Sequence, residues 1–193
     1  SNNGTIKMNK RNKGITVAYA ALTQQLKIEG TAKVASSKWD VHFGTVSAGN
    51  AQGYATAGTL AKTGETTIAG DIGTLKAPGD SITYTFDIEN AGDINAIIDT
   101  VTGGQSFTCT SATKSVADAV CKDLTYSIKY TDGNATIAKG DKLAKATSAS
   151  APTKKNVTLT ITYNKTDAQQ TLASEDVTVT ADPMTITYVQ DAK

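Results

Sequence analysis

The segment LKAPGDSITYTFDIENAGDINAII, residues 75–98, decides the fold class. Its Pro78-Gly79 pair predicts a type II turn, because proline presets φ at the first central position and glycine accepts the positive φ at the second. Residues 81–90 then alternate, and the apolar members are Ile82, Tyr84, Phe86 and Ile88. Alternation of period two is typical of a strand with one face on the core and one in water. We therefore predict a half-buried antiparallel strand here.

The same alternation recurs along the chain, whereas helical periodicity is nearly absent. Further strands are predicted over residues 15–21, 26–35, 37–49, 94–104, 123–133 and 156–165, and as two short ones near the C-terminus. In residues 37–49 we expect Trp39 to anchor the core. Residues 50–74 predict a long excursion with one or two short strands, residues 115–120 a single helical turn, and residues 139–155 a mobile surface loop.

About nine or ten strands with regular turn signals predict an all-β fold, a jelly-roll-like or immunoglobulin-like antiparallel β-sandwich. The 193 residues suit one such domain. We predict an N-terminal arm over residues 1–20 and a single sandwich domain over residues 21–193. The arm also has the layout of a residual signal peptide, because a basic stretch (8–13) precedes an apolar one (14–20).

The charge of the chain is balanced, with 19 basic and 18 acidic side chains and a net charge of +1. Proteins that bind nucleic acid or anionic membranes need a concentrated patch of basic side chains, and a balanced charge does not favour one. Neither is therefore expected as the main partner. We expect no membrane span, since no apolar run reaches the length that one requires. A small net charge also opposes self-association only weakly.

No constellation of residues points to catalysis. The only histidine, His42, falls on the solvent face of its predicted strand, away from any nucleophile motif. Asp87 and Glu89 share a strand face, where acidic side chains are expected for solvation rather than for glycosidase chemistry. The aspartates in turns lack calcium-loop spacing. We expect no enzyme activity, no catalytic residue, no cofactor and no metal site.

Two cysteines, Cys109 and Cys121, lie twelve positions apart in FTCTSATKSVADAVC. Their spacing favours a disulfide formed in an oxidising, extracellular setting, and the alternative is a pair of reduced thiols. Four Asn-x-Ser/Thr sequons mark candidate N-glycosylation sites, at Asn3, Asn134, Asn156 and Asn164. These sites matter only in a host that glycosylates.

The arm carries alternating apolar residues without an evident partner, at Ile6, Met8, Ile15, Val17 and Tyr19. Such a segment favours strand addition, in which it completes the sheet of a neighbouring copy. A head-to-tail contact of this kind does not close, so it generates filaments. The alternative is an ordinary first strand paired within its own sheet.

Four stretches together resemble the TasA/camelysin (CalY) family of secreted biofilm-fibre proteins from Gram-positive bacteria. They are AYAALTQQLKIEG, KWDVHF, APGDSITYTFDIENAGDINAII and the two-cysteine loop before DLTYSIKYTDG. The resemblance implies a jelly-roll-like fold, export, and polymerisation by insertion of an N-terminal strand, here within residues 1–20, into the next subunit. The long hydrophobic export helix usual in that family is missing from this sequence.

We therefore expect a structural subunit of an extracellular filament, a biofilm matrix fibre or a pilus-like polymer. Its partner would be itself, head to tail, with other matrix or cell-surface components as further partners. The alternative is a monomeric cell-surface adhesin or glycan-binding module that uses the loops at residues 44–74 and 139–155.

Overall fold

The computed structural model describes residues 3–5 and 22–192, and the chain divides into two compact units, Ser1–Ser36 and Ser37–Lys193. The division falls between residues 36 and 37, not after residue 20 as expected from the sequence. The second unit, called the domain below, carries most of the strands.

Among residues 3–5 and 22–36, the described part of the first unit, there is one short ladder. β1 (Asn3–Thr5) pairs antiparallel with β2 (Thr23–Gln25). The strand predicted over residues 26–35 does not form, because this stretch finds no ladder partner among the described residues. Its large apolar side chains, Ile28 and Val34 among them, lie almost fully in water. The alternation in residues 26–35 therefore marks an amphipathic stretch, and the prediction of a paired strand here is wrong.

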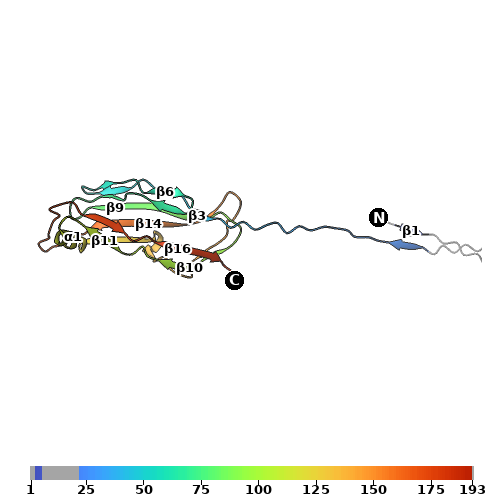
Figure 1. Ribbon diagram of the computed structural model, residues 1–193. Helices are drawn as coiled ribbons and strands as arrows, with labels where there is room; N and C mark the ends of the chain where they lie inside the picture. The colour runs from blue at the N-terminus through green and yellow to red at the C-terminus, as the bar shows by residue number, and fades with distance from the viewer. Residues whose placement is uncertain (1–2, 6–21, 193) are drawn as a thin grey trace, which may run out of the picture. The chain divides into compact units, whose positions relative to one another are not determined.

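The domain is an all-β sandwich with one helix (Figure 1). Its elements in chain order are β3 (Val41–Phe43), β4 (Asn50–Gln52), β5 (Thr56–Ala57), β6 (Ala61–Gly64), β7 (Thr67–Ala69), β8 (Gly73–Thr74), β9 (Ser81–Asn90), β10 (Ala96–Thr102), β11 (Phe107–Thr110), α1 (Lys114–Cys121), β12 (Leu124–Tyr130), the 3-10 turn η1 (Asp132–Asn134), β13 (Lys142–Leu143), β14 (Thr153–Tyr163), β15 (Thr178–Ala181) and β16 (Thr185–Gln190). All pairings are antiparallel.

Two sheets form the layers. The large sheet has the order β12-β14-β9-β3, and β4 pairs with the other half of the same edge of β9. The small sheet has the order β13-β10-β16, and the separate pair β11-β15 follows β10 and precedes β16 in the chain. Two further pairs, β5-β8 and β6-β7, come from residues 50–74, which hold five short strands rather than the one or two predicted.

The opening segment of the sequence behaves as predicted. In β9 every second residue is buried, and Ile82 and Tyr84 are 0% and 1% exposed. Before the strand, Gly79 has φ 99° and the Asp80 N–H donates to the Ala77 carbonyl over 3.0 Å, as a turn with proline and glycine in its centre requires. Turn and strand are therefore both confirmed.

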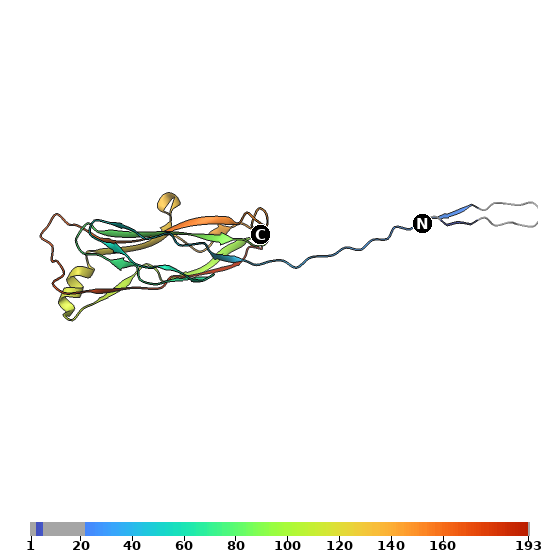
Figure 2. The ribbon, with the colours of Figure 1, turned by 90° about the horizontal axis from the view of Figure 1, so that it is seen from above.

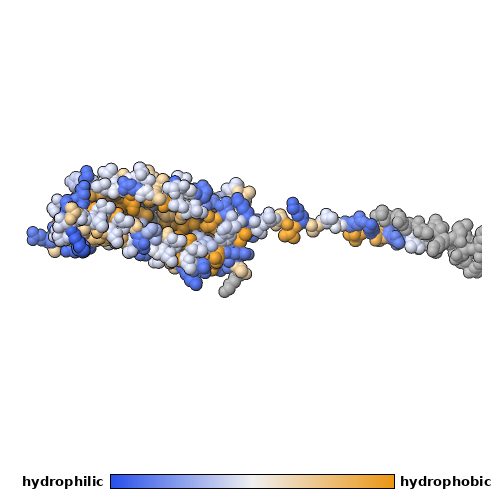
Figure 3. Space-filling model, viewed as in Figure 1, coloured by the Kyte–Doolittle hydropathy of each residue, from blue (hydrophilic) through white to orange (hydrophobic). Residues whose placement is uncertain are grey.

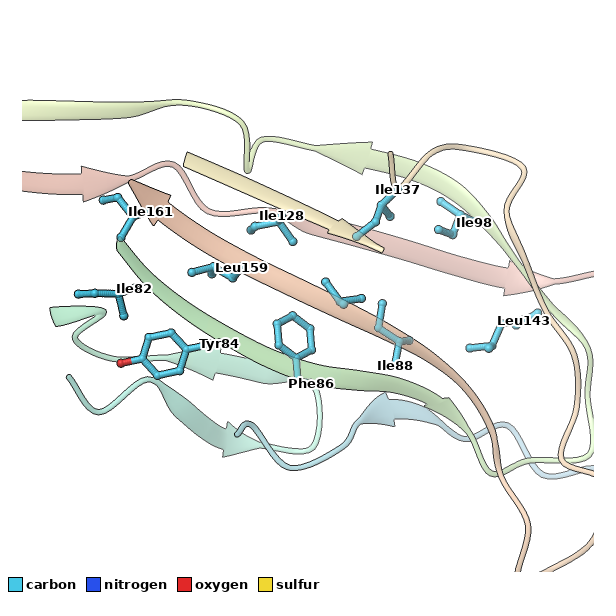
Figure 4. Close-up of a cluster of buried hydrophobic side chains, with 12 residues drawn as sticks. Ile82, Tyr84, Phe86, Ile88, Ile98, Ile128, Ile137, Leu143, Leu159 and Ile161 are labelled. Carbon is cyan, nitrogen blue, oxygen red and sulfur yellow. The ribbon is translucent and has the colours of Figure 1, made fainter. Parts of the chain in front are cut away.

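The core lies between the sheets (Figure 4). Side chains of β9, β12 and β14 form one continuous apolar layer on the inner face of the large sheet. Ile98 of β10 packs into the same cluster, as do Ile137 and Leu143 from the connection that follows β12. Leu143 is 1% exposed, so the stretch predicted as a surface loop supplies part of the core.

Trp39 does not anchor this core, because its side chain is 45% exposed. Only residues 41–43 of the predicted strand pair with β9. The preceding residues are held by a turn instead: the Lys38 carbonyl accepts from the Asp93 N–H, and the Asp40 carbonyl accepts from the Ala91 N–H. The core anchors from this strand are Val41 and Phe43, and the Phe43 ring meets Phe86 edge-on at 5.5 Å.

The domain has two distinct ends. In Figure 2 the helix α1 lies at one end of the domain, called the helix end, and the C-terminus lies at the other. The second end, called the turn end, holds the Asn90–Ile94 turn, because Ala96 just after this turn pairs with Gln190 near the C-terminus. β9 runs from the helix end to the turn end. Its first residue, Ser81, pairs with Thr162 near the end of β14, and the next residue of β14, Tyr163, pairs with Leu124, where β12 begins just after α1. The chain enters the domain at the turn end through Lys38 and Asp40.

Candidate functional site: an open groove between two strand edges

An apolar groove with a volume of about 590 Å³ opens between the small sheet and the β6-β7 pair. Its floor is the inner face of the large sheet, where Phe86, Ile128 and Leu159 contribute side chains. One wall is residues 66–70, which include β7, and the other is residues 181–188, from the end of β15 into β16. In Figure 1, β9 and β14 are visible between β6 above and β16 below.

The lining of the groove is predominantly apolar. Figure 3 shows orange side chains gathered along a hollow on this face of the domain, between paler rims. Ile68 on one wall and Ile186 and Tyr188 on the other are half-buried rather than closed over. Partly exposed apolar surface in a groove beside the core is a typical feature of binding sites.

Both walls are strand edges that lack a partner on the groove side within the described part of the chain. β7 pairs with β6 alone, and β16 pairs with β10 alone. The direction of the free groups follows from Asp191, whose N–H donates to the Asn95 carbonyl over 2.8 Å beside β10. Because the direction alternates along an antiparallel strand, the N–H and C=O groups of Ile186, Tyr188 and Gln190 point toward the groove.

Burial changes the acidity of the tyrosines along the groove. Desolvation raises the pKa of Tyr126 and of Tyr188 to about 12, and for Tyr188 the nearby Asp141 carboxylate adds to the effect. Both phenols are therefore neutral at physiological pH. The groove presents to a ligand an apolar floor bordered by the unpaired edges of β7 and β16.

Asp80 holds the β7 side of the groove in place. Its Oδ1 accepts the Tyr54 N–H, and its Oδ2 accepts the N–H groups of Lys76 and Ala77, each over 2.9 Å. The side chain is 1% exposed, and burial alone would raise its pKa, but the three backbone donors and the Lys76 charge outweigh that effect and lower the pKa below its usual value. The carboxylate thus ties the excursion of residues 50–74 to the start of β9.

The disulfide between Cys109 and Cys121 is present and holds the other wall. It joins the last residue of α1 to β11, with the two Cα atoms 5.9 Å apart. In the β11-β15 ladder Cys109 faces Val179, so the crosslink fixes the strand that leads into the wall of the groove. This sequence prediction is confirmed.

The predicted surface residues of the large sheet form an ionic cluster on its outer face. His42 Nδ1 lies 2.7 Å from Asp40 Oδ1, and its Nε2 lies 3.9 Å from Glu89 Oε1. The hydrogen bond to His42 is the main cause that lowers the pKa of Asp40. Asp87 binds the Asn156 amide over 2.9 Å. These contacts pair each of the three carboxylates with a neighbouring side chain.

The candidate glycosylation sites differ in how open they are. Asn134 is exposed in η1 with φ 51°. The Asn156 amide is engaged, because it donates to Asp87 and to the Phe86 carbonyl and accepts from Thr131. Asn164 is half-buried at the end of β14, where its N–H donates to the Asp123 carbonyl. Asn3 lies in β1, and the structure does not describe its side chain.

The residues predicted to donate a strand, Ile6, Met8, Ile15, Val17 and Tyr19, all lie outside the described residues. The prediction that residues 1–20 form the donor therefore stays a prediction. Of that stretch the structure describes only β1, which pairs with β2.

Residues 3–5 and 22–192 contain no group of three or more His, Cys, Asp or Glu side chains placed to share a metal ion. Over the same residues, no helix has the length and hydropathy needed to cross a bilayer.

A second concavity, polar and about 430 Å³ in volume, lies near the turn end. It is lined by Tyr130, Asp132, Ala135, Asp141, Lys142, Lys154, Lys155 and Asn156. Tyr130 donates its hydroxyl to Asp141 Oδ2 over 2.6 Å, and burial together with that bond raises the pKa of Tyr130. The lysines give this surface donors for oxygen-rich groups.

Comparison with known proteins adds no assignment: no protein-family model, no curated protein and no solved structure matches this chain.

The groove itself was not predicted from the sequence. Its floor was predicted correctly as core, but the two free edges belong to β7 and β16, and no periodicity in a single strand reveals which side it leaves unpaired.

Proposed function

We propose that this protein is a structural subunit of an extracellular filament that polymerises head to tail, each copy placing a strand from before its domain into the groove of the next. The observation that carries the proposal is the groove with its two facing free edges. A single extended strand would pair with β16 on one side and β7 on the other, and its alternate side chains would cover Phe86 and Ile128.

Three further features support this role. Exposed strand edges promote association unless charge, proline or a cover blocks them, and the β16 edge carries Ile186 and Tyr188 with no charged side chain among residues 185–190. The disulfide fits an oxidising compartment outside the cytoplasm. The resemblance to the TasA/camelysin fibre family in the PGD-strand pattern points the same way, toward a secreted, non-enzymatic matrix component.

The test uses the full chain with Ile186→Asp, which places a charge on the groove wall, and Thr187→Asp as its matched control. Thr187 is the exposed neighbour whose side chain points to the other face. We expect the unchanged chain and Thr187→Asp to form filaments by negative-stain microscopy, and Ile186→Asp to remain monomeric.

Folding is checked by circular dichroism. If Ile186→Asp unfolds, Ile186→Pro replaces it, because this change removes an N–H that points to the groove and leaves the bonds to β10 intact. Filaments formed equally by a folded groove variant, or a wild-type chain that stays monomeric at every concentration, would overturn the proposal.

A second candidate, a glycan-binding surface module, is favoured by the polar concavity beside Tyr130, Lys142 and Lys154. It predicts saturable binding on a glycan array that Lys154→Ala weakens, by a chain that stays monomeric. Filament formation by the same preparation separates the two candidates.

A further inference from the structure

We infer that the donated strand is Leu22–Val34, and that it inserts antiparallel to β16. This inference rests on the proposed function and names its partner segment, which differs from the arm over residues 1–20 predicted from the sequence. It is carried by the side chains of the segment, its length and its point of attachment to the domain.

The segment displays an apolar face that nothing in the described residues covers. Leu22 is 82% exposed, Leu26 78%, Ile28 99% and Val34 97%. Few places in a folded protein leave four large aliphatic side chains in water on one short stretch. Covering them contributes favourable free energy, so the segment needs a partner that buries one face.

The four side chains share one face of an extended strand. They occupy even-numbered positions, together with Gln24, Gly30 and Ala32, whereas the odd-numbered positions carry Thr23, Gln25, Lys27, Glu29, Thr31 and Lys33. One face therefore fits the apolar floor of the groove, and the other fits water at its mouth. This is the pattern that β9 shows, but without a sheet of its own.

Length and edge chemistry agree as well. An extended chain from Leu22 to Val34 spans about 40 Å, and β15 and β16, which contribute the groove wall of residues 181–188, together run over the same number of residues, from Thr178 to Gln190. Insertion would replace the three-residue ladder between β1 and β2 with a longer one along β15 and β16. The exchange therefore gains backbone pairs as well as apolar burial.

The tether sets the direction. Lys38 is fixed at the turn end, because its N–H donates to Asp93 Oδ1 over 2.7 Å and its carbonyl accepts the Asp93 N–H over 3.0 Å. Only Ala35, Ser36 and Ser37 separate it from Val34, a reach of about 14 Å at most. The covalent connection therefore keeps Val34 of the donating copy within this reach of Lys38.

In a head-to-tail chain the turn end of one copy meets the helix end of the next. Val34 then lies at the helix end of the receiving groove and Leu22 at its turn end. β16 runs from the helix end to the turn end, since its last residues pair with Ala96 beside the Asn90–Ile94 turn. The donor is antiparallel to it. The opposite direction would bring two turn ends together and close into a swapped dimer instead of a filament.

The identity of the donor is tested by three single substitutions in the full chain: Ile28→Asp on the apolar face, Thr31→Asp on the polar face as matched control, and Val17→Asp in the other candidate strand. We expect Ile28→Asp to raise the concentration needed for filaments at least tenfold, because an aliphatic side chain no longer enters the groove. Thr31→Asp and Val17→Asp should polymerise like the unchanged chain. Loss of filaments in Val17→Asp with retention in Ile28→Asp overturns this inference and leaves strand donation standing. Absence of filaments in every protein, including wild type, refutes the proposed function itself.

Direction is tested with cysteine pairs and a short bis-maleimide, which spares the native disulfide. The antiparallel arrangement predicts that Thr23→Cys with Gln190→Cys gives a ladder of covalent multimers, whereas Thr23→Cys with Thr178→Cys does not react between copies. The two acceptor positions are about 40 Å apart, so a slip of a few residues does not blur the result. A covalent dimer from the Thr178→Cys pair, or filaments that neither pair cross-links, overturns the inferred direction.

Discussion

Replacing the buried carboxylate of Asp80 by an amide, Asp80→Asn, should destabilise the domain strongly. Asp80 is 1% exposed and accepts three backbone N–H bonds of 2.9 Å from Tyr54, Lys76 and Ala77. A hydrogen bond to a charged group contributes about 1.5–3 kcal/mol, and asparagine keeps only one acceptor while turning two donors toward the remaining N–H groups. We expect a loss of about 2–4 kcal/mol.

The assay is urea unfolding followed by circular dichroism at neutral pH. With a slope of about 2 kcal/mol per molar urea, the midpoint should fall by about 1–2 M while the slope stays unchanged. Asp132→Asn is the matched control, because Asp132 is exposed and should change stability by less than about 0.5 kcal/mol.

Acid gives a second, independent readout of the same carboxylate. Because the folded pKa of Asp80 lies below the ordinary value of about 3.9, the carboxylate contributes fully to the free energy of unfolding above about pH 3.9. It is lost as the pH falls through the lower, folded pKa. The difference in the free energy of unfolding between wild type and Asp80→Asn should therefore become smaller in acid. Equal stability of Asp80→Asn and Asp132→Asn at neutral pH, or a gap that widens in acid, would refute the reasoning.

Three other expectations follow from the described contacts. Reducing the Cys109–Cys121 bond, or replacing both cysteines by serine, should lower stability by about 3 kcal/mol, seen as a lower melting temperature in calorimetry, and an unchanged melting temperature in reductant would contradict this. Tyr84→Phe removes a hydroxyl that donates to the Ile72 carbonyl over 2.8 Å and should lower the free energy of unfolding by about 1 kcal/mol. Tyr163→Phe removes a buried hydroxyl without a partner among the described residues, so it should leave the stability unchanged or raise it. Chemical denaturation that ranks the two variants the other way would contradict this. Ultraviolet titration should find Tyr126 and Tyr188 ionising near pH 12. Because their folded pKa values exceed the pKa of about 10 in the unfolded chain, their contribution to the free energy of unfolding should be full below pH 10 and fall as the pH rises from about 10 to 12. Phenolate absorbance complete by pH 10 would count against the burial of both rings.

Much of the fold was predictable where local chemistry and burial agree. In β9 the proline–glycine turn fixes where the strand begins, and strict alternation fixes which face is buried. The cysteine pair was predictable for the same reason, since a short spacing between strand-like segments favours a closed loop.

Periodicity reports an amphipathic face but not what covers it. Residues 26–35 alternate as well as β9 does, yet they form no ladder with any described strand. Trp39 has the size and position of a core residue, but the carbonyls of Lys38 and Asp40 accept hydrogen bonds from the Asn90–Ile94 turn and hold that stretch at the end of the sheet. These long-range contacts leave no local signal in the sequence.

The groove was beyond prediction for a related reason. A free edge is a property of the assembled sheet, and β7 and β16 are far apart in the chain. Asp80 likewise looked like an ordinary turn residue, because the donor from Tyr54 reaches it only after residues 50–74 fold back.

The way the chain enters the domain has a mechanical consequence. β3 begins at the turn end and is bonded to β9 by a ladder that lies across the strand direction. Tension applied to the chain ahead of Ser37, directed away from the turn end, slides β3 along β9. All the bonds of that ladder are then loaded at once instead of opening one after another. A pull along the strand axis therefore meets shear resistance rather than unzipping, which suits the domain to bear load in that direction.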